Sequence, residues 1–207
     1  MDVYKSSKTM TKQNKSWKKC ESDCFRFWKI LVEKEVHSTA YMLRLIANSI
    51  LKTENQNESI VFQVETSSTL TGVWEQDYQK INFQIKNENE KKKTKRTILG
   101  FGPSASGKTY WAKQIIELFV KQDNTFPEIF LAVDGGLMRE VSVVYQTILE
   151  QNEIKGIPGF LNLVSAGISI LNPSIFASDK IKKQLMKFLE YQSQKGNRIS
   201  LYVPETL

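Results

Sequence analysis

The feature that most restricts the fold of this chain is an eight-residue run with the pattern G-x-x-x-x-G-K-[ST]. It follows a strand-like segment, residues 97–101, and precedes a helix-like segment, residues 110–121. In this context the pattern predicts a phosphate-binding loop, because the glycines let the backbone approach an anion that the loop N–H groups and the positive helix end face. The alternative is a glycine-containing surface turn. The run consists of Gly102, Pro103, Ser104, Ala105, Ser106, Gly107, Lys108 and Thr109.

Two side chains of this loop have predicted roles toward a nucleotide. Lys108 would reach the β- and γ-phosphate oxygens, and the Thr109 hydroxyl would bind Mg²⁺. The sequence therefore predicts a site for ATP or GTP together with Mg²⁺.

Composition places the chain among ordinary globular proteins. Its 207 residues suffice for one large domain or two small ones. No apolar run is as long as a membrane span, and the first residues, MDVYK, lack the apolar core of a secretory signal, so we expect a cytoplasmic protein. Cys20, Cys24 and His37 offer fewer than the four ligands of a structural zinc site, so two thiols in a reducing compartment are expected instead.

Positive charge is concentrated before the predicted loop. The formal net charge is +7, and residues 1–96 contain 18 Lys and Arg against 12 Asp and Glu. Two runs, Lys5–Lys19 and Lys91–Arg96, carry most of the excess. Such runs can bind nucleic acid or anionic surfaces, and Trp17 and Trp28 near the first run are compatible with base stacking. The alternative is that the runs are a solvated tail and a solvated linker and that the two tryptophans are packed in the protein.

Hydrophobic periodicity predicts a four-part organisation of the chain. Residues 1–23 are expected to be a basic, disordered tail, and residues 24–90 a small α+β region with helices within 24–52 and strands at 60–65 and 80–85. Residues 91–96 are the expected linker. Residues 97–207 are then expected to form a domain of alternating strands (97–101, 129–134, 198–203) and helices (109–121, 137–150, 178–194).

This alternation predicts an α/β fold with a parallel sheet flanked by helices and right-handed crossovers. Such a sheet binds its ligand at the carboxyl ends of its strands, where the loop lies. The apolar residues Trp111, Ile115 and Phe119 recur at helical spacing and are expected to form one apolar stripe on the helix after the loop.

A second group of candidate residues follows the buried-strand pattern Ile129–Val133. Asp134 comes at the carboxyl end of this strand, and a carboxylate there can hold Mg²⁺ or take the proton of an acceptor hydroxyl. Gly135 and Gly136 would let a substrate approach the backbone. Arg139, in the next helix, can contact a phosphate or an acidic acceptor group. The alternatives are a strand-end turn residue for Asp134 and a solvated helix residue for Arg139.

The order of loop, helix, hydrophobic strand, Asp and Arg-containing helix resembles the zeta-toxin and polynucleotide-kinase-like group of P-loop kinases. It is similar also to bacterial effectors of this type that phosphorylate NAD. The resemblance covers residues 97–150 and, more weakly, 178–207. It implies a P-loop NTPase-type fold, with Asp134 as the base that activates the acceptor hydroxyl and with Lys108 and Thr109 at the nucleotide. It also suggests an effector that acts in a host cytosol.

The chain departs from this group in one respect. The group has a five-stranded core and a lid with phosphate-binding arginines, whereas this chain ends after its third expected core strand and has only Arg139 and Arg198 after the loop. Glu205, near the end of the last expected strand, is a further candidate for binding a substrate or metal at the edge of the sheet. The alternative is a plain strand-end residue. A truncated fragment, a site completed by another subunit, or a minimal domain would each explain the difference.

The resulting hypothesis is a kinase with Asp134, Lys108 and Arg139 as catalytic residues. It would transfer the γ-phosphoryl group of ATP or GTP to a hydroxyl of a nucleotide, NAD or a nucleotide-sugar. The alternatives are a non-catalytic nucleotide-binding or interaction module and an NTPase that acts on nucleic acid through the basic runs.

Overall fold

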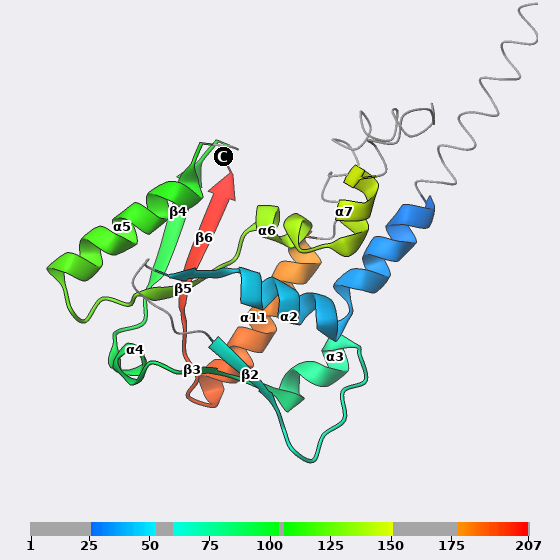
Figure 1. The fold of residues 1–207 in the computed structure, drawn as a ribbon, viewed down its shortest axis with the longest axis horizontal. Helices are drawn as coiled ribbons and strands as arrows, with labels where there is room; N and C mark the ends of the chain where they lie inside the picture. Colours follow the sequence, from blue (N-terminus) through cyan, green and yellow to red (C-terminus); the bar gives the residue numbers. More distant parts are fainter. Residues whose placement is uncertain (1–25, 53–59, 104–105, 151–177, 207) are drawn as a thin grey trace, which may run out of the picture. The chain divides into compact units, whose positions relative to one another are not determined.

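The computed structural model describes residues 26–52, 60–103, 106–150 and 178–206 (Figure 1). The chain forms two compact units, the first composed of Met1–Val36 and Ser142–Ser178, and the second of His37–Val141 and Asp179–Leu207. The predicted tail at 1–23, with Lys5–Lys19, Trp17 and Cys20, lies outside the described residues, and so does Cys24. In the described part of the chain, no helix combines the length and the apolar character needed to cross a membrane.

A four-stranded sheet of the second unit carries the expected α/β architecture. Its order is β1–β5–β6–β4, in which β6 pairs in parallel with both β5 and β4, and β1 pairs antiparallel with β5. The predicted parallel sheet is therefore confirmed for the three strands that the sequence pattern identified. The strands are β1 (Ile50–Lys52), β4 (Thr97–Gly102), β5 (Ile129–Ala132) and β6 (Ser200–Thr206).

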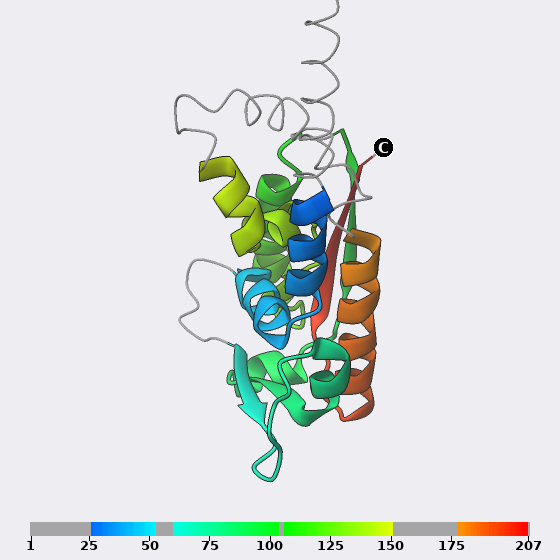
Figure 2. The same ribbon diagram turned by 90° about the vertical axis from the view of Figure 1, so that its right-hand side faces the viewer.

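Helices α5 (Lys108–Gln122) and α11 (Ser178–Gln194) lie on opposite sides of β6, as Figure 2 shows with α5 in green and α11 in orange. Tyr202 of β6 faces α5 and is buried with Ala112 and Ile116 of that helix. The apolar stripe identified in the sequence is not the side of α5 that is buried, because Trp111, Ile115 and Phe119 are 61%, 39% and 44% exposed.

Helix α11 has the bounds that the sequence predicted and a regular amphipathic pattern. Its Phe188 ring lies 5.1 Å from that of Trp74 in α3 (Trp74–Asp77). Gln192 holds β3 (Ile81–Ile85) by donating from Nε2 to the Ile81 carbonyl (2.6 Å) and accepting from the Phe83 N–H (3.3 Å). The buried residues of the helix recur every three or four positions: Ile181, Gln184, Leu185, Phe188, Leu189 and Gln192.

The elements before the loop are partly those expected. Strands β2 (Ile60–Val64) and β3 lie where the alternating patterns predicted strands, and the structure pairs them antiparallel. The expected helical stretch 24–52 is divided into a helix at 26–36 in the first unit, α2 (Thr39–Asn48) and the strand β1, which the sequence analysis did not identify. A short 3₁₀ helix, η1 (Tyr78–Lys80), follows α3.

The basic residues at 91–96 lie within the second unit, next to a buried carboxylate. Helix α4 (Glu88–Lys92) begins at an Asn87 cap whose side chain accepts from the N–H groups of Asn89 and Glu90. Glu90 is 0% exposed, and the ammonium groups of Lys93 and Lys95 lie 3.8 and 3.7 Å from its carboxylate oxygens. Glu90 also accepts from the Glu128 N–H (3.0 Å).

The first unit contains the helix at 26–36 and α7 (Val143–Glu150) among its described residues. Glu35 joins them, because its carboxylate accepts from the Ser142 hydroxyl and from the Val143 N–H (2.7 Å). Ser142 also caps α7 by accepting from the Tyr145 N–H (3.0 Å). The single helix predicted at 137–150 is therefore two helices, α6 (Gly135–Glu140) and α7.

Asp77 links α2 and α3 through a buried hydrogen-bond network. Its side chain is 0% exposed and accepts from the Thr39 hydroxyl (2.6 Å) and the N–H groups of Thr71 and Gly72 (both 2.8 Å). Burial by itself would raise the pKa of Asp77, but these hydrogen bonds outweigh it and lower the pKa to about 2.

Acid should therefore weaken the second unit through Asp77. A carboxyl group whose pKa is lowered on folding stabilises the fold at pH values above its ordinary pKa, near 3.8. That contribution disappears as the pH falls toward 2. We expect about 2 kcal/mol of unfolding free energy to be lost over this range. In Asp77→Asn, urea unfolding should show a lower free energy at pH 7 and no such loss below pH 4; an unchanged profile would contradict this role. Glu88→Gln, at an exposed carboxylate, is the control.

Candidate phosphate-binding site

The predicted loop connects β4 directly to α5. Gly102, the last residue of β4, has a φ of 156°, and Gly107, immediately before α5, has a φ of 73°. These values favour glycine at both positions. A Cβ at Gly102 would also approach the Ser106 hydroxyl oxygen to 3.2 Å. Ser104 and Ala105 lie outside the described residues.

Lys108 extends over the loop from the first position of α5. Its ammonium group donates to the backbone carbonyl oxygens of Gly102 (3.0 Å) and Pro103 (2.6 Å). Thr109 follows in the first turn of the helix and is half-buried. The loop thus brings a cation and a hydroxyl to the start of a helix at the carboxyl end of a parallel strand, an arrangement that suits an anionic group.

Asp134 lies at the same edge of the sheet, because β5 runs parallel to β6 and β6 parallel to β4. It caps α6 by accepting from the Gly136 N–H at Oδ1 (2.7 Å). A Cβ at Gly136 would lie 3.2 Å from that oxygen, so glycine allows the close approach. Tyr41 of α2 fixes the helix by donating its hydroxyl to the Met138 carbonyl (2.8 Å).

Tyr202 connects the two candidate groups, and the sequence analysis did not identify it. It lies on β6, between the strands of the loop and of Asp134, and is 1% exposed. Burial raises the pKa of its hydroxyl, the nearby Asp134 carboxylate raises it further, and the Thr109 side chain acts in the opposite direction. Among the described residues its buried hydroxyl has no hydrogen bond of good geometry. Tyr202 therefore stays neutral between Thr109 and Asp134.

Gly100 provides the space that the Tyr202 ring occupies. A Cβ at Gly100 would lie 2.9 Å from the Tyr202 hydroxyl oxygen and 3.0 Å from Cε2. We expect Gly100→Ala to lower the free energy of unfolding by about 1–3 kcal/mol, because the buried ring must shift. Urea unfolding measures this, and adding Tyr202→Phe should recover part of the loss. Gly135→Ala, where a Cβ meets nothing within 4 Å, is the control; equal losses in the two variants would contradict the steric role.

The remaining predicted residues lie at different places. Arg139 is half-buried on α6, five residues after Asp134, and no carboxylate of the described chain lies within 4.0 Å of it. Glu205, near the carboxyl end of β6, faces Lys182 of α11 at 3.4 Å. Arg198 precedes β6 and is therefore at the opposite edge of the sheet from the loop.

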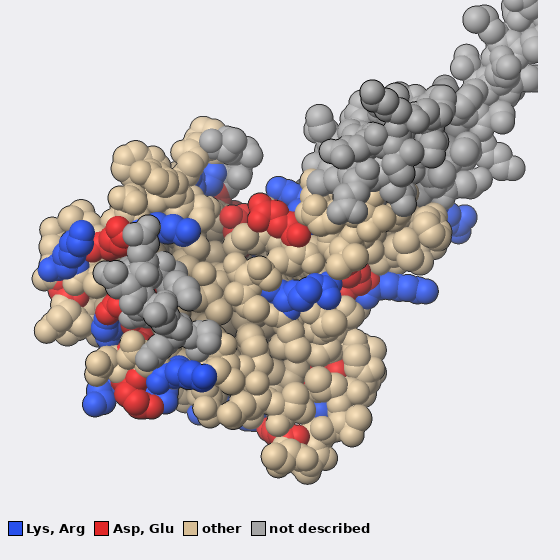
Figure 3. Space-filling view, in the orientation of Figure 1, with Lys and Arg blue, Asp and Glu red and all other residues tan. Residues whose placement is uncertain are grey.

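Positive and negative side chains are mixed on the surface of the described residues. On the face shown in Figure 3, Lys and Arg side chains are interspersed with Asp and Glu around α4 and α5. Within the described residues, no three His, Cys, Asp or Glu side chains are grouped as ligands of a metal ion. His37 instead contacts the Glu75 carboxylate, with Nδ1 at 2.8 Å.

Comparisons with known proteins give no relative for this chain. No protein-family model matches it, and neither curated proteins nor solved structures give a significant match.

Proposed function

We propose that the protein is a P-loop kinase that binds ATP or GTP with Mg²⁺ and phosphorylates a hydroxyl of a nucleotide, NAD or a nucleotide-sugar. The observation that carries the proposal is the strand–loop–helix at Gly102–Thr109, in which the Lys108 ammonium lies over the loop at the carboxyl edge of a parallel sheet. Nucleotide phosphates would take the place of the two carbonyl oxygens as partners of this ammonium.

Oxygen donors suited to Mg²⁺ are present beside the loop. Mg²⁺ prefers oxygen ligands and is usually held by few protein groups together with substrate phosphates and water. The half-buried Thr109 hydroxyl is such a group, and when bound the ion would neutralise charge on the β- and γ-phosphates. A site of this kind needs no cluster of protein carboxylates.

Asp134 is the proposed base of the reaction. The acceptor oxygen would form a bond to the γ-phosphorus, the bond to the β-phosphate oxygen would break, and the proton of the acceptor hydroxyl would pass to Asp134. Its Oδ1 accepts the Gly136 N–H, which fixes the carboxylate and leaves Oδ2 for the substrate. Arg139, on the helix that Asp134 caps, is the proposed contact to an anionic group of the acceptor.

One observation favours a second candidate, a non-catalytic nucleotide-binding module. Asp134 has a structural role as the cap of α6, and this role alone would explain the residue in a protein that catalyses no reaction. This alternative retains the nucleotide at Lys108 and Thr109 but predicts no transfer.

Phosphoryl transfer distinguishes the two candidates. The protein is incubated with Mg²⁺ and γ-labelled ATP or GTP and a panel of nucleosides, nucleotides, NAD and nucleotide-sugars. Label in an acceptor product, lost in Lys108→Ala, supports the kinase. Binding of nucleotide without transfer to any acceptor favours the module, and absence of nucleotide binding contradicts both.

A further inference from the structure

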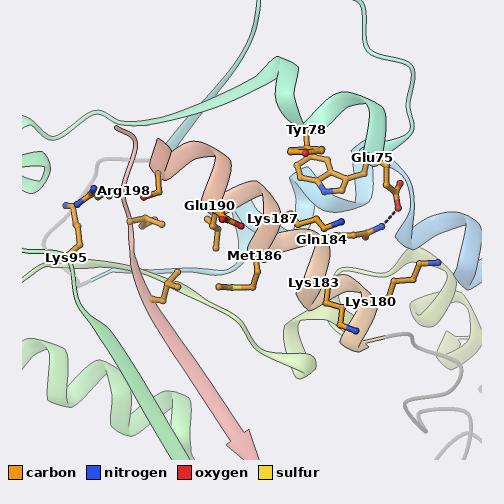
Figure 4. A pocket seen from close by; sticks show the side chains of 15 residues that line it. Glu75, Tyr78, Lys95, Lys180, Lys183, Gln184, Met186, Lys187, Glu190 and Arg198 are labelled. Carbon is orange, nitrogen blue, oxygen red and sulfur yellow. Dashed lines mark hydrogen bonds between the residues drawn. The ribbon is translucent and has the colours of Figure 1, made fainter. Parts of the chain in front are cut away.

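A second concave site lies along α11. It is a groove of about 990 Å³ between α11, the α3–η1 segment and the beginning of β6, here called the α11 groove (Figure 4). Neither Asp134 nor any loop residue that the structure describes contributes to it. Apolar side chains form much of its lining: Trp74, Tyr78, Met186, Leu189, Ile199 and Leu201.

Positive side chains surround this apolar lining. Lys180, Lys183 and Lys187 line one part of the groove from successive turns of α11, and Lys95 and Arg198 lie at its other end, as Figure 4 shows. Lys95 pairs with the buried Glu90. For the other four cations, no carboxylate of the described residues lies within 4.0 Å; their charge is therefore available to a partner.

Negative charge in the groove is smaller. Among the described residues, two carboxylates belong to the lining, those of Glu75 and Glu190. Glu75 is already held by His37 and by the Gln184 amide. The excess of positive over negative side chains in the groove therefore favours an acidic occupant.

The apolar surface continues from the groove along the sheet. Leu201 pairs in register with Thr97, and Leu99 and Phe101 lie further along the same face of β4. Leu99 and Phe101 are 57% and 60% exposed, and Met186 of α11 is 44% exposed. An exposed apolar strip with a charged rim is typical of a protein-binding surface.

We propose that the α11 groove binds an amphipathic helix of a partner protein whose flank is acidic. Lys180, Lys183 and Lys187 have the i, i+3, i+7 spacing that carboxylates on successive turns of a neighbouring helix match. The part of α11 that lines the groove, from Lys180 to Ser193, is about 20 Å long at 1.5 Å per residue, which fits a helix of three to four turns. The apolar residues of that helix would cover Met186 and Leu201.

The apolar lining disfavours nucleic acid as the occupant. Bases bind protein by stacking on accessible rings, whereas Trp74 is 1% exposed and packs on Phe188. A phosphate backbone would pair with the lysines but leave the apolar side chains uncovered. The proposal does not depend on the proposed kinase activity, because the loop and the groove share no residue.

A peptide-display selection on the full chain tests the proposal. The library consists of 15-residue helical peptides with Leu at i, i+3, i+4 and i+7 and with flanking positions randomised among Glu, Lys, Gln and Ser. We expect selected peptides to be enriched in Glu over Lys, and the affinity of a selected peptide to fall at least tenfold in Lys183→Glu/Lys187→Glu. Because these side chains are exposed, the variant should fold, which circular dichroism checks.

Two controls make the outcome specific. Lys113→Glu/Lys121→Glu changes charge by the same amount on the exposed surface of α5 and should leave the peptide affinity unchanged. A peptide with Lys in place of Glu should bind the Lys183→Glu/Lys187→Glu variant better than the wild type. Failure to select any binder, selection of Lys-rich peptides, or equal losses in both double variants would overturn the proposal. Tighter binding of a 15-nucleotide single strand, lost in the same variant, would assign the groove to nucleic acid.

Discussion

Replacing Lys108 by Ala should reduce the affinity for Mg·ATP by about a hundredfold or more. The Lys108 ammonium lies on the loop, within 3.0 Å of the Gly102 and Pro103 carbonyl oxygens, and would make charge-assisted hydrogen bonds to phosphate. Each such bond contributes about 1.5–3 kcal/mol, so two of them account for this loss. The fold should remain, since Lys108 is half-buried and its partners are carbonyl oxygens of an exposed loop.

Isothermal titration calorimetry with Mg·ATP measures this effect. Lys113→Ala is the matched control, because Lys113 is an exposed residue of the same helix, five positions after Lys108, and should leave the affinity unchanged. Urea unfolding of both variants shows that any loss of binding is not a loss of structure. Equal affinities of the wild type and Lys108→Ala would remove the basis of the proposed nucleotide site.

Local patterns predicted most of the sheet and its helices. Helix α11 was predicted at residues 178–194, and both bounds agree. Strand β5 is buried at all four positions, as its continuous apolar run indicated. These elements depend on features that are readable within one segment, which is why the sequence was sufficient.

Features that depend on distant residues were not predictable in this way. Strand β1 has only three residues and pairs with β5, some eighty residues away in the chain. The end of α6 and the beginning of α7 depend on Ser142 and on Glu35, which lies on a different segment. In each case the partner, rather than the local pattern, determines the structure.

The candidate site likewise combines residues that a local pattern predicted with residues that only distant contacts reveal. The loop residues were identified from their spacing, and Asp134 from its position after an apolar strand. Tyr202 was not identified, because an alternating strand pattern does not tell which face meets α5. Its contact with Gly100 becomes apparent only when β4 and β6 are paired, with Gly100 opposite Pro204 in register. The apolar stripe of α5 did not reveal the buried side of that helix for a related reason: apolar residues occur on both sides, and it is Ala112 and Ile116 that pack with Tyr202.

Asp134→Asn should slow phosphoryl transfer by about 10²–10⁴-fold and leave Mg·ATP affinity unchanged if Asp134 is the acceptor-side base. The substitution keeps the size of the side chain, and the Asn oxygen can still accept the Gly136 N–H that Asp134 now binds at 2.7 Å. The cap of α6 is therefore retained, and a fall in rate reports the loss of a proton acceptor rather than of structure. Transfer to the best acceptor and calorimetric affinity are measured on the same preparation.

The two proposed chemical roles of Asp134 give different results in this experiment. A metal ligand would lower the nucleotide affinity in the presence of Mg²⁺ but not in its absence, whereas a base would lower only the rate. Asp123→Asn is the matched control, because Asp123 likewise accepts a backbone N–H two residues ahead, from Thr125 at 2.8 Å, but lies after α5 and away from the loop. Undiminished transfer in Asp134→Asn would exclude both chemical roles and leave Asp134 as the cap of α6 alone.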